Sequence, residues 1–172
     1  MTAPFVIERL SPAHDRRGFS CGVERLDLYL SRQASQDVRK RAANCFVAIA
    51  RDTGTIAGYY TLSASGLAFS ELPFAFRKGL PRYDIVPAAL IGRLAVDLRF
   101  RGTGLGEALI FDAVDRALVS DPAIFAIVVD AKDERAASFY RHYEFQPTLS
   151  RPLTLFLPVS FFAKRPRPKD SP

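Results

Sequence analysis

The stretch Arg93–Ile110, "RLAVDLRFRGTGLGEALI", decides the fold of this chain. It joins an apolar run to a glycine-rich turn and then to a segment whose apolar residues follow the helical period. Glycines stand at alternate positions of the turn, at 102, 104 and 106. A strand that leads through such a turn into a helix gathers unpaired N–H donors at the positive end of a helix dipole. The stretch therefore predicts a phosphate-binding βα unit.

The spacing of the turn separates the kinds of phosphate site. A nucleoside triphosphate loop needs a lysine after its last glycine, and none follows here. A dinucleotide fingerprint is closer, because Asp130 ends the next apolar run where a ribose-binding acid would lie. It fails because Glu107 stands at the third glycine position and because the turn lies mid-chain, after an antiparallel hairpin. A tight βα connection without ligand is the structural alternative, for which one glycine would suffice.

The residues "RGTGLG", Arg101 to Gly106, resemble the R/Q-x-x-G-x-G/A motif of the GNAT acetyltransferases, whose turn wraps the pyrophosphate of acetyl-CoA. The preceding "LAV" and the later "DERAASFYRHYEF" are similar to the family's strand and its second cofactor-facing helix. The resemblance implies an α/β (α+β) GNAT fold, a mixed central sheet of about six or seven strands flanked by about four helices. It also implies acetyl-CoA as co-substrate and no metal.

The other elements agree with that order. "PFVIERL" predicts a first strand, residues 21–43 predict two short helices, and "NCFVAIA" and "IAGYYTLSAS" predict a hairpin that turns at Gly54. "ELPFAFRKGLPRYDIVP" predicts an irregular surface loop because of its three prolines. Later runs predict two more strands around a helix capped by Asp133, with a short strand at "EFQPTL". The helix after the turn should bury Ile110, Ala113, Val114, Ala117 and Leu118 and turn Asp112, Asp115 and Arg116 outward.

Composition bounds the class of protein. With 172 residues, 48% hydrophobic and 24% charged, the chain fits a single GNAT domain over residues 1–162 and a basic, proline-rich, flexible tail over 163–172. The formal net charge of +6 favours an anionic partner. No run approaches the roughly 20 apolar residues of a membrane span, and no signal peptide is recognisable, so a cytoplasmic protein is expected. The two cysteines, Cys21 and Cys45, are expected to be reduced thiols.

A narrower resemblance is to the GNAT toxins of bacterial toxin–antitoxin pairs. It is carried by "FSCGVERLDLYLSRQASQD", "GYYTLSAS", "IGRLAVD" and "VVDAKDERAASFY". It implies acetylation of the α-amino group of aminoacyl-tRNA, a block of translation, a cognate DNA-binding antitoxin and a homodimer. Glu144 departs from the family, which usually has glycine there. Two alternatives stay open: acetylation of a small amine or a protein N-terminus, and a cofactor- or RNA-binding module without turnover.

The same resemblance implies roles for individual residues. The backbone of Ala95 and Val96 would align the pantetheine arm and polarise the thioester carbonyl. The pyrophosphate would lie against Arg101, Gly102, Thr103, Gly104, Leu105 and Gly106. Tyr140 would protonate the departing thiolate, since ordinary phenol and thiol pKa values lie within about two units. The alternative for Tyr140 is a place in the core, because Ala136, Phe139, Tyr140 and Tyr143 follow the helical period.

A strong general base is not required by this chemistry. His14 and His142 are the only histidines, and neither ends a strand near the turn. A free α-amine titrates near 8 and its ester lower, so much of it is neutral at cellular pH. A lysine side chain would need a base more urgently, which disfavours lysine acetylation.

An RNA substrate requires a basic surface. Arg93 is a lone cation in an apolar strand near the expected acceptor, and it must either pair with an acid or reach a cleft. Contacts to phosphate would give position and not sequence. The alternative for such charges is an ordinary solvated face. The other candidates lie on the second predicted helix and in the proline-rich loop: Arg32, Arg39, Lys40, Arg41, Arg77, Lys78 and Arg82.

Overall fold

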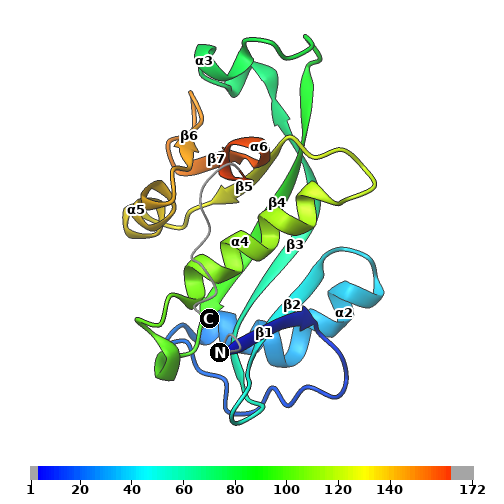
Figure 1. The fold of residues 1–172 in the computed structure, drawn as a ribbon, viewed down its shortest axis with the longest axis vertical. Helices are drawn as coiled ribbons and strands as arrows, with labels where there is room; N and C mark the ends of the chain where they lie inside the picture. The colour runs from blue at the N-terminus through cyan, green and yellow to red at the C-terminus, as the bar shows by residue number, and fades with distance from the viewer. Residues whose placement is uncertain (1–3, 164–172) are drawn as a thin grey trace. The chain divides into compact units, whose positions relative to one another are not determined.

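The computed structural model describes residues 4–163 (Figure 1). These residues form two compact units, the first of residues 4–63 and 92–112 and the second of residues 64–91 and 113–163. Seven strands are hydrogen-bonded in the order β1-β2-β3-β4-β5-β7-β6. β4 and β5 run parallel, whereas β1 and β2, β2 and β3, β5 and β7, and β6 and β7 are antiparallel. The predicted mixed sheet of six or seven strands is therefore confirmed.

In the first unit, β1 (Phe5–Arg9) pairs with β2 (Asn44–Ala50), and β2 pairs with β3 (Ile56–Ala68). The predicted hairpin turn is confirmed at Gly54, which has a φ of 71°. The predicted pair of helices is α1 (Glu24–Leu28) and α2 (Ala34–Arg39), but a π-helical turn, η1 (Tyr29–Gln33), joins them without a break. Leu30 from this turn and Tyr59 from β3 lie in the buried core of the unit.

β4 (Ile85–Val96) leads through a short 3₁₀ turn, η3 (Leu98–Phe100), into α4 (Leu105–Leu118). The predicted stripe on α4 is buried at Ile110, Ala113, Val114 and Ala117. The prediction is wrong for Leu118, which is 43% exposed because the helix ends there. It is also wrong for Asp112, which is half-buried and accepts a hydrogen bond of 2.6 Å from the Tyr60 hydroxyl. Asp115 and Arg116, also expected to face outward, are half-buried too.

The proline-rich segment belongs to the second unit, where the prediction of an irregular loop is wrong in part. It begins at the last residue of η2 (Phe69–Glu71) and contains α3 (Phe74–Arg77) and the first residues of β4. Phe76 packs edge-on against Phe156, with ring centroids 5.1 Å apart. This apolar contact orders a segment whose three prolines suggested irregular structure.

The rest of the second unit is β5 (Ala126–Asp130), α5 (Glu134–His142), β6 (Gln146–Pro147), β7 (Thr154–Pro158) and α6 (Val159–Ala163). Asp133 caps α5 as predicted, since its carboxylate accepts a 2.8 Å hydrogen bond from the Ala136 N–H. Sequence patterns had indicated neither α3 nor α6.

The two cysteines are free and buried in the first unit. Burial raises the pKa of Cys21 to about 11 and that of Cys45 to about 12, so both stay protonated near neutral pH. No helix within residues 4–163 is long and apolar enough to span a bilayer. The predicted basic tail lies outside the described residues from Lys164 onward.

Candidate active site

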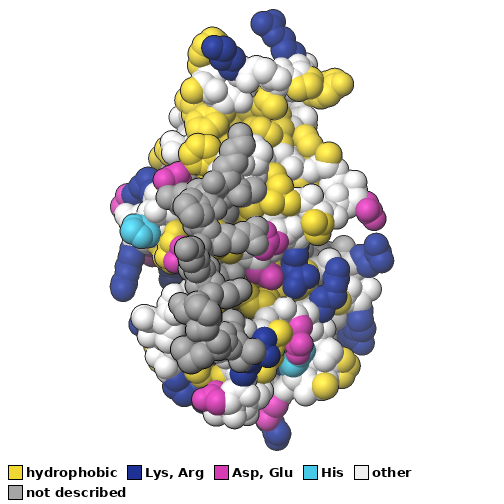
Figure 2. Space-filling view, viewed as in Figure 1, with side chains coloured by type: hydrophobic (Ala, Val, Ile, Leu, Met, Phe, Trp, Pro, Cys, Tyr) yellow, Lys and Arg dark blue, Asp and Glu magenta, His cyan; other side chains and the backbone are white. Residues whose placement is uncertain are grey.

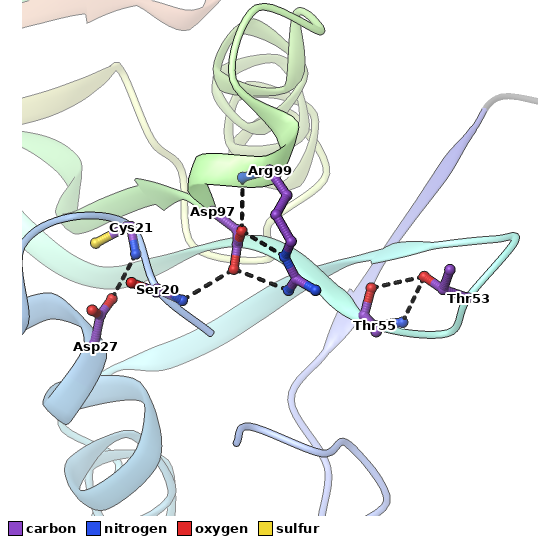
Figure 3. A network of polar contacts seen from close by, with 7 residues as sticks. All are labelled: Ser20, Cys21, Asp27, Thr53, Thr55, Asp97 and Arg99. Atoms are coloured by element: carbon purple, nitrogen blue, oxygen red, sulfur yellow. Dashed lines mark hydrogen bonds and ion pairs between the residues drawn. The ribbon is translucent and has the colours of Figure 1, made fainter. Parts of the chain in front are cut away.

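Asp97 fixes the point where β4 enters the glycine turn (Figure 3). Its side chain is buried, and its carboxylate accepts the N–H groups of Ser20 at 3.0 Å and Arg99 at 2.9 Å. The Arg99 guanidinium donates two further hydrogen bonds, of 2.9 and 3.1 Å. Burial works against the charged form, but the hydrogen bonds from Arg99 and Ser20 outweigh it and hold the pKa of Asp97 below its ordinary value. An ionised carboxylate therefore holds the start of the turn.

The segment Ser20–Gly22 lies against this turn. The Leu98 N–H donates to the Ser20 carbonyl at 2.9 Å, and the Arg101 guanidinium donates to the Cys21 carbonyl at 3.1 Å. The Cys21 N–H in turn donates to the carboxylate of Asp27 in α1, at 2.9 Å (Figure 3). The structure thus uses one of the five N–H donors of Arg101 to clamp the N-terminal segment onto the turn.

The turn itself is open and shaped for an anion. Gly102 and Gly104 have φ values of 74° and 81°, in the left-handed region, and a Cβ on either would meet nothing within 4 Å. Thr103 lies between them, and its hydroxyl donates to the Phe100 carbonyl at 2.6 Å. The first N–H groups of the 14-residue α4 have no acceptor inside the helix. Exposed N–H donors at the positive end of a helix dipole form a phosphate site.

Two predicted cofactor residues at the start of α4 can contribute backbone only. Leu105 is 2% exposed, so its side chain belongs to the core, and Gly106 has no side chain. On the strand, Ala95 is buried and Val96 is half-buried. Sequence patterns did not single out Gly58 in β3, although a Cβ there would lie 2.9 Å from the Ala95 carbonyl oxygen. Its only sequence signal is a glycine inside a strand, which often marks a close backbone approach.

Tyr140 lies on α5 in the second unit. Its ring is half-buried and meets the rings of Phe139 and Phe145 edge-on, with centroids 5.1 and 5.3 Å away. Burial raises its pKa to about 12, so the hydroxyl keeps the proton that a general acid must donate. The difference between the pKa of Tyr140 and that of an ordinary thiol is therefore larger than the roughly two units expected from the sequence. Within residues 4–163 the hydroxyl makes no hydrogen bond, which leaves it free to meet a substrate atom.

Glu144 follows α5 with a φ of 71°, a left-handed conformation that favours glycine. The family resemblance predicts glycine at this position. The turn keeps the left-handed conformation that glycine favours, although the residue here is glutamate. The chain turns there because the N–H groups of Glu144 and Phe145 bond back to the carbonyls of Arg141 and Tyr140, at 2.9 and 3.2 Å.

Neither histidine provides a base beside the glycine turn in the first unit. His14 accepts the Ser11 N–H on Nδ1 at 2.9 Å and meets the Glu8 carboxylate with Nε2 at 2.6 Å, so both ring nitrogens are engaged. His142 belongs to the second unit and is exposed at the end of α5. Among the described residues, no group of three His, Cys, Asp or Glu side chains could hold a metal ion.

The predicted RNA-binding cations differ in their surroundings. Those of the first unit, Arg32, Arg39, Lys40 and Arg41, are exposed along η1 and at the end of α2, and Figure 2 shows Lys and Arg side chains on the side where α2 lies. In the second unit, Lys78 and Arg82 are exposed. Arg77 differs from them, because its guanidinium donates to the Leu72 and Ser70 carbonyls at 2.7 and 2.9 Å and so holds its own loop.

Arg93 makes no hydrogen bond or ion pair with an acid among residues 4–163. Arg93 is half-buried in the first unit, and the central carbon of its guanidinium lies 3.6 Å from the centroid of the Tyr29 ring. A cation over an aromatic face takes the place of a hydrogen-bonded acid, and the Arg93 charge also helps to lower the pKa of Asp37.

The profile of the acetyltransferase (GNAT) domain matches residues 41–147. The chain belongs to the GNAT acetyltransferase family. Two curated relatives of this GNAT protein are toxins. The tRNA-acetylating toxin of Mycobacterium tuberculosis (strain ATCC 25618 / H37Rv) is 37% identical over 87% of this chain and 89% of its own. The probable toxin TacT of Sinorhizobium fredii (strain NBRC 101917 / NGR234) is 31% identical over 90% of this chain and 91% of its own.

Solved structures agree with this family. AtaT complexed with acetyl-methionyl-tRNAfMet superposes with a TM-score of 0.83 at 27% identity, over 92% of this GNAT chain and 97% of AtaT. AtaTR bound with AcCoA gives a TM-score of 0.75 at 26% identity, over 93% and 96% of the two chains. A variant AtaT toxin bound to the C-terminus of the antitoxin AtaR gives 0.74 at 25% identity, over 94% and 97%.

Proposed function

We propose that this GNAT acetyltransferase moves the acetyl group of acetyl-CoA to the α-amino group of an aminoacyl-tRNA and so blocks translation as a toxin. The observation that carries the proposal is the open glycine turn at the start of α4, in a chain 37% identical to a tRNA-acetylating toxin. A phosphate site of this kind would hold the pyrophosphate of coenzyme A.

The residues present fit acetyl-CoA. The backbone N–H groups from Gly102 to Gly106 would hold the pyrophosphate. The Arg101 guanidinium would add its positive charge and its remaining N–H donors to this site. The backbone of Ala95 and Val96 would hold the pantetheine arm at the end of β4. When bound, acetyl-CoA supplies the acetyl group as an activated thioester.

Tyr140 would act as the general acid for the leaving thiolate. Its half-buried phenol holds a proton throughout the physiological range, and proton transfer to a fully formed thiolate is uphill from a pKa near 12. A hydrogen bond that strengthens as charge develops on sulfur would serve the same purpose. The ester-linked α-amine needs no strong base, because its ordinary pKa near 8 is lowered further by the ester.

The RNA would lie along exposed cations. The first unit offers Arg32, Arg39, Lys40 and Arg41, and the second offers Lys78 and Arg82. Arg77 would act on RNA only indirectly, through the loop that it holds. Such contacts neutralise phosphates, so binding should weaken with salt.

Radiolabelled acetyl-CoA tests the function directly. The protein is incubated with bulk aminoacylated tRNA, with the same tRNA deacylated, and with peptide and polyamine acceptors. Label is expected on charged tRNA alone and should leave with the amino acid on mild alkaline hydrolysis of the ester. Equal labelling of deacylated tRNA, or labelling of peptide or polyamine only, would refute this substrate, and cofactor binding without transfer would favour a binding module.

The partners follow from the relatives. AtaT binds an antitoxin, AtaR, and we expect a cognate antitoxin that suppresses the growth arrest caused by this chain. A homodimer, cytoplasmic residence, a single GNAT domain over residues 1–162 and a flexible tail over 163–172 stay predictions. Light scattering of the purified chain and limited proteolysis check the first and the last of these.

A further inference from the structure

The Arg93 guanidinium stands out because nothing within residues 4–163 uses its N–H groups. No hydrogen bond or ion pair joins it to the described residues. It lies over the Tyr29 ring face at 3.6 Å, and its charge helps to lower the pKa of the nearby Asp37 carboxyl. A half-buried guanidinium loses hydration free energy on folding, and contact with an aromatic ring compensates for only part of that loss. Its five N–H donors point along the plane of the guanidinium, so a planar fork is left for an acceptor from outside.

The ring beneath Arg93 is held in place from several sides. Tyr29 is 5% exposed, its hydroxyl donates to the Asp37 carboxylate at 2.7 Å, and it stacks on Tyr59 with centroids 6.3 Å apart. The amide of Gln33 donates to the other oxygen of Asp37 at 2.9 Å. The hydrogen bond from Gln33, and to a smaller extent that from Tyr29, holds the pKa of Asp37 below its ordinary value. The ring therefore cannot turn aside, and the guanidinium over it is oriented.

The π-helical turn brings this support together. In a regular α-helix, residues eight apart point about 80° away from each other around the axis. The turn Tyr29–Gln33 closes with the Ala34 N–H bonded to the Tyr29 carbonyl, five residues back, which lowers the rotation per residue. Tyr29 and Asp37 thus come to the same side of the helical segment. Inserted π turns of this kind are frequent at functional sites.

The strand under Arg93 is also specialised. The backbone N–H of Arg93 donates to the hydroxyl of the buried Thr61 at 3.1 Å. A Cβ on the preceding Gly92 would lie 3.1 Å from the same hydroxyl, so glycine leaves room for this contact. Arg93 is two residues from Ala95, where the thioester is expected, so its side chain would lie on the acceptor side of that strand.

We propose that Arg93, oriented by the Tyr29 ring, binds the phosphate of the 3′-terminal nucleotide of the charged RNA acceptor. This assignment rests on the proposed function and deepens it. In an aminoacyl ester the α-carboxylate is consumed, so the nearest anion to the attacking amine is that phosphate. A guanidinium matches a phosphate through two parallel hydrogen bonds, and one such contact near the amine fixes its distance from the thioester.

Truncated acceptors test the assignment. The wild-type protein and Arg93→Gln are assayed for acetyl transfer to an aminoacylated cytidylyl-adenosine, which carries the phosphate, and to an aminoacyl-adenosine, which lacks it. We expect Arg93→Gln to lower kcat/KM on the dinucleotide by about 10- to 100-fold, mainly through KM. On the nucleoside the change should be less than twofold.

Arg9→Gln is the matched control. Arg9 lies in the same unit and also covers an aromatic ring, that of Phe46 at 5.4 Å, but it is exposed and distant in sequence from β4. It should leave both acceptors unchanged. An equal loss on both acceptors with Arg93→Gln, or no loss on either, would overturn the phosphate assignment while the function stands. Wild-type protein that acetylates no charged acceptor would instead refute the proposed function, and this assignment with it.

Tyr29 is the positioning residue, and two variants separate its ring from its hydroxyl. Tyr29→Leu should raise KM for the dinucleotide several-fold while KM for acetyl-CoA stays the same. Tyr29→Phe keeps the ring and loses the bond to Asp37, so a smaller rise is expected. Unchanged KM values in a folded Tyr29→Phe and a folded Tyr29→Leu would remove the ring from the assignment, and thermal unfolding reports whether each is folded.

Discussion

Replacing Asp97 with asparagine should destabilise the protein by about 2–4 kcal/mol at pH 7. The carboxylate accepts two backbone N–H groups, from Ser20 on one oxygen and Arg99 on the other. Asparagine keeps only one of the two acceptor oxygens. One of the two backbone N–H groups would therefore face the amide NH₂, and the hydrogen bond of the other would no longer be made to a charged acceptor. Hydrogen bonds to buried charged groups contribute about 1.5–3 kcal/mol each. The Arg99 side chain is 56% exposed, so its own pairing adds about 1 kcal/mol or less.

The pH dependence follows from the lowered pKa of Asp97. A carboxyl whose pKa is lower in the folded than in the unfolded state adds stability that is complete above the unfolded value, near 3.9. That stability is lost as the pH falls through the folded pKa. The difference between wild type and Asp97→Asn should therefore be constant from pH 7 to about pH 5 and should shrink below pH 4.

Urea unfolding of both proteins at pH 7, 5.5 and 3.5 measures this difference. Asp15→Asn is the control, because Asp15 makes the same three contacts with Arg17, at 3.0, 3.1 and 3.3 Å, while both side chains are exposed. No measurable change is expected there. A loss below about 0.5 kcal/mol at pH 7 for Asp97→Asn, or a loss that grows as the pH falls, would refute the clamp. Weaker acetyl-CoA binding at pH 7 should accompany the instability, because the clamp holds the start of the turn.

Four further results are expected. Glu144→Gly should stabilise the protein by about 0.5–1 kcal/mol in urea unfolding, because glycine adopts a φ of 71° without strain; destabilisation would show that the Glu144 side chain matters more. Gly58→Ala should destabilise it by about 1–3 kcal/mol and weaken acetyl-CoA binding in calorimetry, since the new Cβ would lie 2.9 Å from a β4 carbonyl. Tyr140→Phe should keep acetyl-CoA affinity and lose most turnover; unchanged turnover would return the residue to the core. Reversing Arg39 and Lys40 to glutamate should raise KM for tRNA and flatten its salt dependence, and an unaltered slope would remove them from the RNA surface.

Local features of this fold are readable from the sequence, because each depends on the chain close to it. Gly54 and Gly104 adopt the left-handed conformations that only glycine takes easily, and Asp133 caps a helix through an N–H three residues away. The apolar stripe of α4 follows from its period, apart from Leu118 at the end of the helix. The irregular loop was predicted from prolines, but the packing of Phe76 on Phe156 overrode that signal and formed α3.

The sequence by itself determined the glycine turn, the order of the strands and of the helices other than α3 and α6, and the family. Only the tertiary structure decided which residues meet. The Asp97 carboxylate finds the Ser20 N–H 77 positions away, Arg93 of β4 lies over Tyr29 of the π turn, and Gly58 admits the Ala95 carbonyl. Backbone preferences and periodicity act over a few residues and are written in the local sequence. The partner of a buried charge or the space beside a glycine depends on how distant segments pack, and no pattern along the chain records that.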